Sequence, residues 1–421
     1  MKLIGLSLLI VTSTAAVAIA EGRTDINPAM HYYRAFTLAP DLSQADRDYL
    51  FNTESRGQKL PERFGELVGR YDNQFKLVRQ AAQAAVPCDW GVDMTAGPAT
   101  MLPHLARCKA VAQTARLRAM WDLQNGRQED AIEDLVAALT LARNSSRDGI
   151  LISALVQIAM ENILCSAVAE NFYQFSPENL KQLADRFDAA PLRGTVAACI
   201  PMEKACFSDW LINKIEQLQK DNPGNDNKVM AASRELVAGF DGPEEGQPTQ
   251  PKPSLWEKVN RAAGGTSDGV LKLLREEDPF FQRMAEIMAL PPGQYEDQMK
   301  QFMTEIRKSS NPLVPHMFSA WEKCQPKEFA VLVELAMVRA AVEYKLQGTA
   351  GLQRVADPYG QRPFALERFV SQGVDRGFKL KSAYEGRGFP EVLIFVEKDG
   401  PPFRVNWKNA GEPIQSTPTA K

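Results

Sequence analysis

The segment PHLARCKAVAQTARLRAMWDLQNGRQEDAIEDLVAALTLARNS (residues 103–145) decides the fold of this chain. Its first half begins at Pro103 and ends at Asn125-Gly126, the residue types that helices favour just inside their start and just past their end. Because the connecting turn is so short, this helix and the next must pack antiparallel as a hairpin. The second helix has apolar residues at the i, i+3, i+4, i+7 spacing of an amphipathic helix, namely Ile132, Leu135, Val136, Leu139 and Ala142.

Helical segments continue on both sides of this hairpin. Residues 150–173 are apolar nearly all round, which is typical of a helix in the middle of a bundle or solenoid. Ser176-Pro177 starts another helix, and residues 328–346 form a further strongly apolar one. The sequence therefore predicts a mainly α protein of antiparallel helical hairpins, arranged as a bundle or as a tetratricopeptide-like array, although it shows no clean fixed-period repeat.

The C-terminal part changes to a strand pattern. After Asp357-Pro358-Tyr359-Gly360, short β-prone runs alternate with Gly, Pro and Asp turns, at residues 364–370, 377–384, 391–397 and 403–407. Runs this short with turns this tight predict a small antiparallel meander. We expect its apolar face to pack on the helix at 328–346.

The first twenty residues have the pattern of a secretory signal. Lys2 precedes an apolar stretch at Leu3–Val11, and Ala18-Ile19-Ala20 predicts cleavage after Ala20. The alternative is a membrane anchor, but a membrane-spanning helix needs about 20 apolar residues. The most apolar later stretch, residues 149–160, is also too short. We therefore predict export to the periplasm or beyond the cell, with no transmembrane segment after cleavage.

A change in amino-acid composition marks a boundary within the rest of the chain. Residues 241–253 (DGPEEGQPTQPKP) contain four Pro, two Gly and no apolar residue, which predicts a linker or exposed loop. The predicted organisation is a signal peptide at 1–20, a helical-hairpin domain at 21–240, the linker or loop at 241–253, a second helical region at 254–347, a small antiparallel sheet at 348–410 and a disordered tail at 411–421.

Charge and motifs exclude several function classes. The 421 residues include 49 Lys plus Arg and 52 Asp plus Glu, a net charge of −3, so a nucleic-acid partner is not expected. The histidines, His31, His104 and His316, are far apart, and no nucleophile elbow, Walker A or C-x-x-C motif occurs. The acidic pairs at 129–130 and 133–134 are expected on the solvent side of their helix. We predict no catalytic, metal-binding or cofactor-binding residues and no cofactor, which favours a non-enzymatic protein.

Glu161 and Glu334 are different, because each lies in an otherwise apolar helix. A buried carboxylate needs a partner, for which Arg339 and Lys204 are candidates. We interpret Glu161, Glu334 and Arg339 as buried polar groups of the core, in ion pairs or at its polar edge. General acid–base catalysis is the alternative role for such carboxylates.

The cysteines predict one disulfide in an oxidising compartment, between Cys88 and Cys108. Gly91, Gly97 and Pro98 are able to reverse the chain between them, so that the helix starting at Pro103 returns beside the preceding one. Closing this loop of about 21 residues would contribute roughly 3 kcal/mol in the chain-entropy model. The alternative is two buried free thiols, which are common in protein cores.

The other four cysteines are less constrained. Cys199 and Cys206 are poor partners for each other, because seven residues of helix separate them by ~10 Å. One of them is instead a candidate partner for Cys324. Cys165, in its apolar helix, is expected to be free.

Two parts of the chain resemble known proteins. NPAMHYYRAFTLAPDLSQADRDYL (27–50) and the run 88–162, which begins CDWGVDMTAGPATM, resemble uncharacterised exported proteins of planctomycete-type bacteria. That family implies no activity and no site residues. DPYGQRPFALERF (357–369) and GFKLKSAY (377–384), after a helix, are similar to the helix-plus-sheet end of type II secretion pseudopilins. A pseudopilin keeps an N-terminal membrane helix, whereas the corresponding helix here is internal.

These patterns lead to one leading hypothesis and two alternatives. The leading hypothesis is an exported, non-enzymatic helical scaffold that binds a protein or peptide partner in a groove between helices. One alternative is a cell-envelope hydrolase that uses a carboxylate pair, which requires a pocket where two carboxylates with raised pKa converge. The other is a component of a secretion or pilus-like assembly. The sequence predicts no particular oligomeric state.

Overall fold

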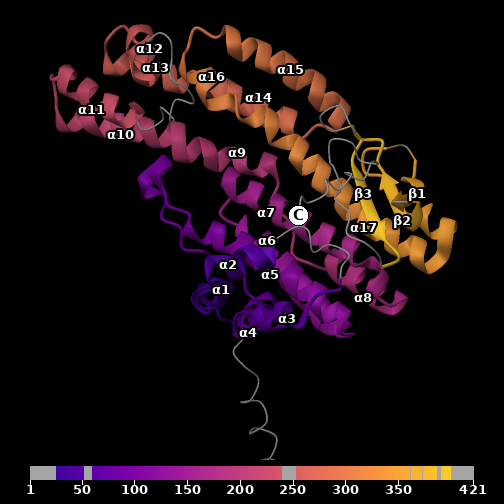
Figure 1. Ribbon diagram of the computed structural model, residues 1–421. Coiled ribbons are helices and arrows are strands. Elements are labelled where there is room, and N and C mark those ends of the chain that lie inside the picture. The colour runs from indigo at the N-terminus through magenta and orange to yellow at the C-terminus, as the bar shows by residue number, and fades with distance from the viewer. Residues whose placement is uncertain are drawn as a thin grey trace, which may run out of the picture.

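The computed structural model describes residues 25–51, 59–238, 253–360, 362–371, 373–385 and 390–399. Within these ranges the chain is mainly helical and ends in a small antiparallel sheet, which confirms the predicted fold class (Figure 1). The predicted signal peptide, the strand predicted at 403–407 and the predicted tail lie outside the described residues. So does the 241–253 segment, except for its last residue.

The hairpin predicted from residues 103–145 is present, with α5 (Pro103–Gln124) antiparallel to α6 (Gln128–Ser145). Pro103 occupies the first turn of α5, and the turn to α6 passes through Gly126, whose φ of +75° is a conformation that suits glycine. Apolar and small side chains of both helices are buried on more than one face. The α5–α6 pair is therefore the centre of the main core.

Neighbouring helices extend this hairpin into two layers. In one layer α6 lies between α4 and α8, and in the other α5 lies between α3 and α7. The long helix α17 packs on α7 and α8 and so continues both layers. This is the order of a helical array. The bounds are α3 (Glu62–Gly69), α4 (Asp72–Ala82), α7 (Leu151–Glu170), α8 (Pro177–Asp188) and α17 (Gln325–Leu352), with α1 (Pro28–Thr37) on α4 and α2 (Gln44–Phe51) beside α3.

Helix α7 is the most enclosed helix of the array. It contacts α5, α6, α17, α9 (Val196–Lys204) and the strand β3 (Val392–Val396), as its nearly uniform apolar sequence predicts. Among the described residues, α7 is also the one helix that is long and apolar enough to cross a membrane by length and composition. More than half of its apolar window is buried against the rest of the protein, as in a core helix.

A second, smaller hydrophobic core lies at one end of the molecule (Figure 1). α9 leads into it through a π-helical turn, η4, and α14 and α15 return the chain to α17. The second core combines helices from both sides of the 241–253 segment, so the cores do not divide there. The bounds are η4 (Ala205–Asp209), α10 (Trp210–Asp221), α11 (Asp226–Ala238), α12 (Leu255–Ala262), α13 (Ser267–Arg275), α14 (Asp278–Met288), α15 (Pro292–Lys308) and α16 (Leu313–Phe318).

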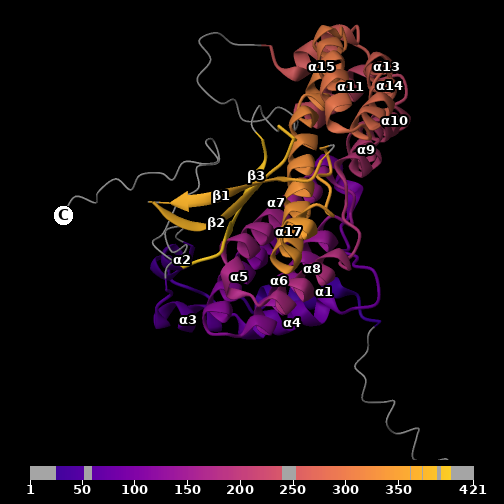
Figure 2. The same ribbon diagram turned by 90° about the vertical axis from the view of Figure 1, so that its right-hand side faces the viewer.

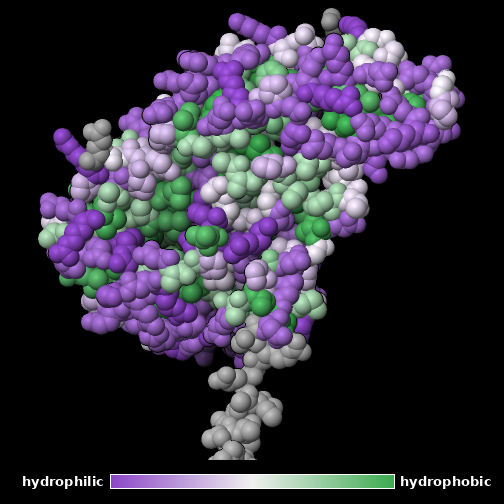
Figure 3. Space-filling view, turned by 180° about the vertical axis from the view of Figure 1, so that it is seen from behind, coloured by the Kyte–Doolittle hydropathy of each residue, from purple (hydrophilic) through white to green (hydrophobic). Residues whose placement is uncertain are grey.

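The sheet is an antiparallel meander of β1 (Ala365–Ser371), β2 (Val374–Lys381) and β3, in that order. Phe378 and Phe395 pair across β2 and β3, and both rings contact Phe172, at centroid distances of 5.9 and 5.3 Å. Tyr344 of α17 packs on Phe378 at 4.9 Å. The sheet thus lies against α17, as predicted, and also against α7 (Figure 2). Seen from behind, the molecule shows recessed apolar surface between hydrophilic margins (Figure 3).

Candidate functional site

The structure places Glu161 in the core, fully buried, with two arginines. Its carboxylate lies 3.5 Å from Arg143 Nε and 3.1 Å from Arg193 Nη2. Arg193 also pairs with Glu328, so one guanidinium bridges α7 and α17. Glu161 thus lies in a buried ion pair, with Arg143 and Arg193 in place of the candidate partners Arg339 and Lys204. Arg143 and Arg193 reach Glu161 from α6 and from the loop after α8, which are distant in sequence.

Glu334 and Arg339 take no part in the ion pairs of Glu161. Both oxygens of Glu334, which is half-buried on α17, accept hydrogen bonds from Asn162 Nδ2 at 2.8 and 2.7 Å. Burial and the nearby charge of Glu391 raise the pKa of Glu334 to about 8. Arg339 is partly exposed and bonds to Asp185 at 2.9 Å, on the neighbouring helix. The three predicted polar residues therefore form no common site.

The predicted disulfide is wrong in this structure, because Cys88 and Cys108 are both free and buried. Between them in sequence, Trp90 stacks on His104 at 4.5 Å and on Tyr32 at 5.6 Å. The indole thus packs beside the first turn of α5. The remaining cysteines are also free and buried, including those considered for a second disulfide: Cys165, Cys199, Cys206 and Cys324.

The most developed polar site is a hollow of about 440 Å³ between α3, α4, α5 and the start of α6, here called the α3–α6 cleft. It collects seven charged side chains around an apolar floor. The lining residues are Gly65, Val68, Gly69, Asp72, Phe75, Lys76, Arg79, Arg118, Trp121, Asp122, Arg127 and Asp130.

The floor of the cleft depends on two glycines of α3. The Trp121 ring lies directly on Gly65, where an added Cβ would be 2.1 Å from Trp121 Cζ2. At Gly69, one turn later, an added Cβ would meet nothing within 4 Å. Gly65 therefore admits the indole into the floor, and Gly69 leaves the cleft open. Phe75 completes the floor beneath Arg118, whose guanidinium carbon is 4.7 Å from the ring centroid.

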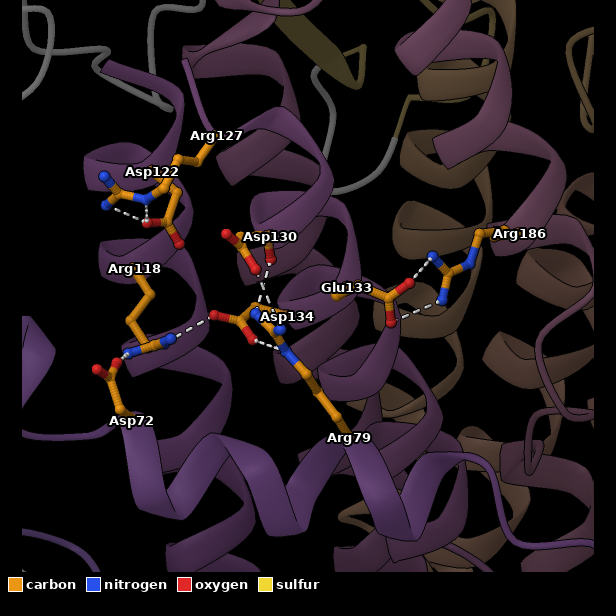
Figure 4. Close-up of polar contacts among 9 residues, drawn as sticks. All are labelled: Asp72, Arg79, Arg118, Asp122, Arg127, Asp130, Glu133, Asp134 and Arg186. Atoms are coloured by element: carbon orange, nitrogen blue, oxygen red, sulfur yellow. Dashed lines mark hydrogen bonds and ion pairs between the residues drawn. The ribbon is translucent and has the colours of Figure 1, made fainter. Parts of the chain in front are cut away.

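A carboxylate behind the floor organises the cleft. Asp134, in the middle of α6, is fully buried and accepts hydrogen bonds from Arg79 Nε at 2.6 Å and Arg118 Nε at 2.7 Å. Figure 4 shows Asp134 between the two arginines, which come from α4 and α5. Each guanidinium is held at its Nε end, and its Nη groups make the outer contacts of the cleft. One buried side chain thus fixes two cations on different helices.

The outer partners of these arginines are exposed. Arg118 Nη1 bonds to Asp72 at 2.5 Å, and Arg79 Nη1 bonds to Asp130 at 3.3 Å (Figure 4). The Asp72 and Asp130 side chains are 66% and 50% exposed. Exposed ion pairs of this kind contribute about 0–1 kcal/mol. The inner contacts with Asp134 are therefore fixed, and the outer ones exchange readily with water or a ligand.

Burial and ion pairing shift the pKa values of these groups in opposite directions. Burial raises the pKa of Asp134, and Arg118 and Arg79 lower it, with burial the larger effect. Burial likewise raises the pKa of Asp122, although Arg127 bonds to it at 2.6 Å. Burial is the largest single effect on Arg79 and Arg118 and lowers the pKa of each, but their contacts with Asp134, together with Asp130 for Arg79 and Asp72 for Arg118, raise the pKa overall.

The cleft lies at one end of a row of ion pairs between helices. Beyond Asp130, Glu133 of α6 pairs with Arg186 of α8 at 2.5 Å (Figure 4). The preceding residue of α8, Asp185, pairs with Arg339 of α17. The row runs across the neighbouring helices α4, α6, α8 and α17, and each of its ion pairs joins one helix to the next.

Chemically, the cleft offers hydrogen-bond donors, acceptors and an aromatic floor in fixed positions. Its lining contains no histidine, cysteine, serine or threonine to act as a base or nucleophile. Its buried carboxylate, Asp122, is in contact with Arg127. Among the described residues, no group of three or more His, Cys, Asp or Glu side chains is arranged to hold a metal ion. The arrangement is therefore suited to binding.

Sequence reasoning did not identify Asp134 and placed residues 133–134 on the solvent side of their helix, which is wrong for Asp134. Helix α6 has a second buried stripe that includes Ala131, Asp134, Ala138 and Leu141. The small alanines in this stripe allow α4 to approach closely and are the sequence signal for a second buried face. The two arginines come from other helices, and only the tertiary structure brings them together.

No protein-family model, curated protein or solved structure matches this chain.

Proposed function

We propose that this protein is a non-enzymatic scaffold that binds a peptide segment of a partner protein in the α3–α6 cleft. The observation that carries the proposal is Asp134, which holds Arg79 and Arg118 in place beside an open apolar floor. Side chains that are already ordered lose little conformational entropy when a ligand binds. The predicted signal peptide would put this binding in the periplasm or outside the cell.

The dimensions and chemistry of the cleft support a peptide ligand. A hollow of about 440 Å³ has room for a few side chains of a bound segment. Trp121 and Phe75 offer aromatic surface for apolar side chains, and the charged rim offers partners for polar ones. Helical arrays commonly present such surfaces between successive helices. The carboxylate-pair hydrolase has less support, because Asp72, Asp122 and Asp130 each contact an arginine.

The test is direct binding of defined peptides to the full chain. Three hexapeptides are compared, in which Phe alternates with Glu, with Gln or with Lys. Each carries a fluorescein label and a C-terminal amide, and its binding is measured by fluorescence anisotropy. We expect at least one of them to bind saturably. The variant Gly69→Phe should abolish this binding, because an added Cβ at Gly69 meets nothing within 4 Å and the new ring would occupy the cleft.

The matched control is Gly293→Phe on α15, where an added Cβ also meets nothing within 4 Å. It should bind the peptide as the unmodified protein does. Thermal unfolding of both variants checks that the fold is kept. Binding that survives Gly69→Phe, or the absence of binding by all three peptides, would contradict the proposed function.

A further inference from the structure

The charged groups of the cleft are not equivalent toward a ligand. Asp134 has both oxygens occupied by arginine Nε groups and is buried behind the floor. Asp72 and Asp130 are at least half exposed and each contacts one arginine. A ligand can therefore replace these outer carboxylates without disturbing Asp134, and it would then face the Nη groups of two guanidiniums.

One positive charge in the cleft, that of Lys76, is not engaged in an ion pair among the described residues. Lys76, on the exposed face of α4, lines the cleft and has no ion-pair partner among the residues that the structure describes. Every carboxylate in the lining, by contrast, contacts an arginine. An incoming anion would therefore gain a free cation, whereas an incoming cation would find each carboxylate already engaged.

The surroundings strengthen an interaction with an anion. Phe75, Val68 and Trp121 line the cleft beside the guanidiniums, and apolar walls lower the local dielectric constant. A carboxylate takes two parallel hydrogen bonds from one guanidinium, the strongest form of this pair. Arg127 adds a third guanidinium farther along the cleft, in contact with Asp122. Cations are thus available for more than one carboxylate.

We infer that the α3–α6 cleft recognises an acidic peptide segment, with side-chain carboxylates of Asp or Glu on Arg79, Arg118 and Lys76 and an apolar side chain against Trp121. This inference rests on the proposed function and specifies its partner. Side chains are the assigned source, because several cations line the cleft and a chain end supplies a single carboxylate.

The experiment compares the Phe–Glu hexapeptide amide with its Gln and Lys counterparts on the full chain. We expect the Glu peptide to bind at least tenfold more tightly than either. A fourth peptide carries Gln in place of Glu and a free C-terminal carboxylate. It should bind no better than the Gln amide. Equal or tighter binding of the Gln, Lys or free-acid peptide than of the Glu peptide would overturn the inference.

Variants then assign the contacts. Lys76→Gln should weaken Glu-peptide binding about threefold or more. The control is Lys109→Gln, at an exposed position in the second turn of α5, which should leave the affinity unchanged. Arg118→Gln should weaken it at least tenfold. Because that variant leaves Asp134 short of a partner, Lys76→Gln is the decisive one, and an unchanged affinity there overturns the role of Lys76.

The two proposals fail differently. If the Gln or Lys peptide binds best and Gly69→Phe abolishes that binding, the cleft binds peptides and the acidic preference is wrong. If no peptide binds, or if binding ignores Gly69→Phe, the proposed function itself is wrong and the inference falls with it.

Discussion

At the scale of single residues, Asp134 has the largest structural role in the cleft. It is fully buried, and its ion-pair partners among the described residues are the guanidiniums of Arg79 and Arg118. Removing one member of a buried ion pair is costly, because the remaining charges lose their compensation. The stability of the array and the geometry of the cleft therefore depend on the same carboxylate.

The substitution Asp134→Asn tests this dependence. We expect it to lower the free energy of unfolding by about 3 kcal/mol, the lower end for a broken buried pair, since Arg79 keeps Asp130 as a partner. Urea unfolding followed by circular dichroism measures the change. Asp130→Asn, on the same helix but half exposed, is the control and should cost less than about 1 kcal/mol. Equal losses in both variants would contradict the assigned role of Asp134.

Glu277 predicts a pH dependence of stability. It is fully buried, its Oε2 accepts a hydrogen bond from Ser208, and burial raises its pKa from 4.5 to about 7. Because the folded-state pKa is the higher one, this group's contribution to stability is fully present below about pH 4.5 and is lost as the pH rises through 7. The neighbouring charges are Asp278, which raises the pKa, and Lys204, which lowers it.

Glu277→Gln should remove this dependence. Between pH 5.5 and 8, the unmodified protein should lose about 2 kcal/mol more of its unfolding free energy than the variant does. Glu276→Gln, at the exposed neighbouring position, serves as the control and should behave like the unmodified protein. Parallel pH profiles for the Glu277→Gln variant and the unmodified protein would exclude a titrating Glu277.

The cysteines give a separate prediction. All six are buried as free thiols, and burial raises the pKa of Cys88 and of Cys199 to about 12. The native protein should therefore react slowly with Ellman's reagent, whereas the denatured protein should release six equivalents. Four equivalents after denaturation without reductant would demonstrate a disulfide and restore the expectation from the sequence.

At the scale of elements, the contact between α3 and α5 depends on a glycine. Gly65 lies under the Trp121 ring, so Gly65→Ala forces the indole out of the cleft floor. We expect a loss of about 1–3 kcal/mol from overpacking and a change in the near-ultraviolet circular dichroism of tryptophan. Gly69→Ala, at an open position of the same helix, should be neutral or slightly stabilising. An unperturbed spectrum for Gly65→Ala would contradict the packing described here.

Single elements were also the level at which the sequence was most informative. Pro103 and Gly126 mark the two ends of α5, because the first and last turns of a helix need specific backbone conformations. Such conformations depend on the residues at the helix end itself, so they can be predicted from the local sequence. The apolar surround of α7 predicted its central place, and the short β-prone runs predicted the meander. Asp134 could not be assigned in this way, since its burial depends on which helix covers its face of α6.

At the scale of the whole molecule, contacts between segments that are distant in sequence determine the features that could not be predicted from local patterns. The arginines that meet at Asp134 belong to different helices, and no spacing within one segment relates them. The expected disulfide is not formed either, since Cys88 and Cys108 are both buried and free. The second core combines helices from both sides of the 241–253 segment, which composition alone does not indicate.

The central claim is that an acidic peptide binds in the α3–α6 cleft against Trp121. The most direct measurement is a titration of the Phe–Glu hexapeptide into protein labelled with ¹⁵N at the tryptophan indoles, followed by NMR. Trp121 is partly exposed in the cleft, whereas Trp90 and Trp321 are buried elsewhere. The account predicts that the Trp121 indole signal shifts saturably, that the signals of Trp90 and Trp321 stay in place, and that Gly69→Phe removes the effect. An unmoved Trp121 signal at saturating peptide would contradict it.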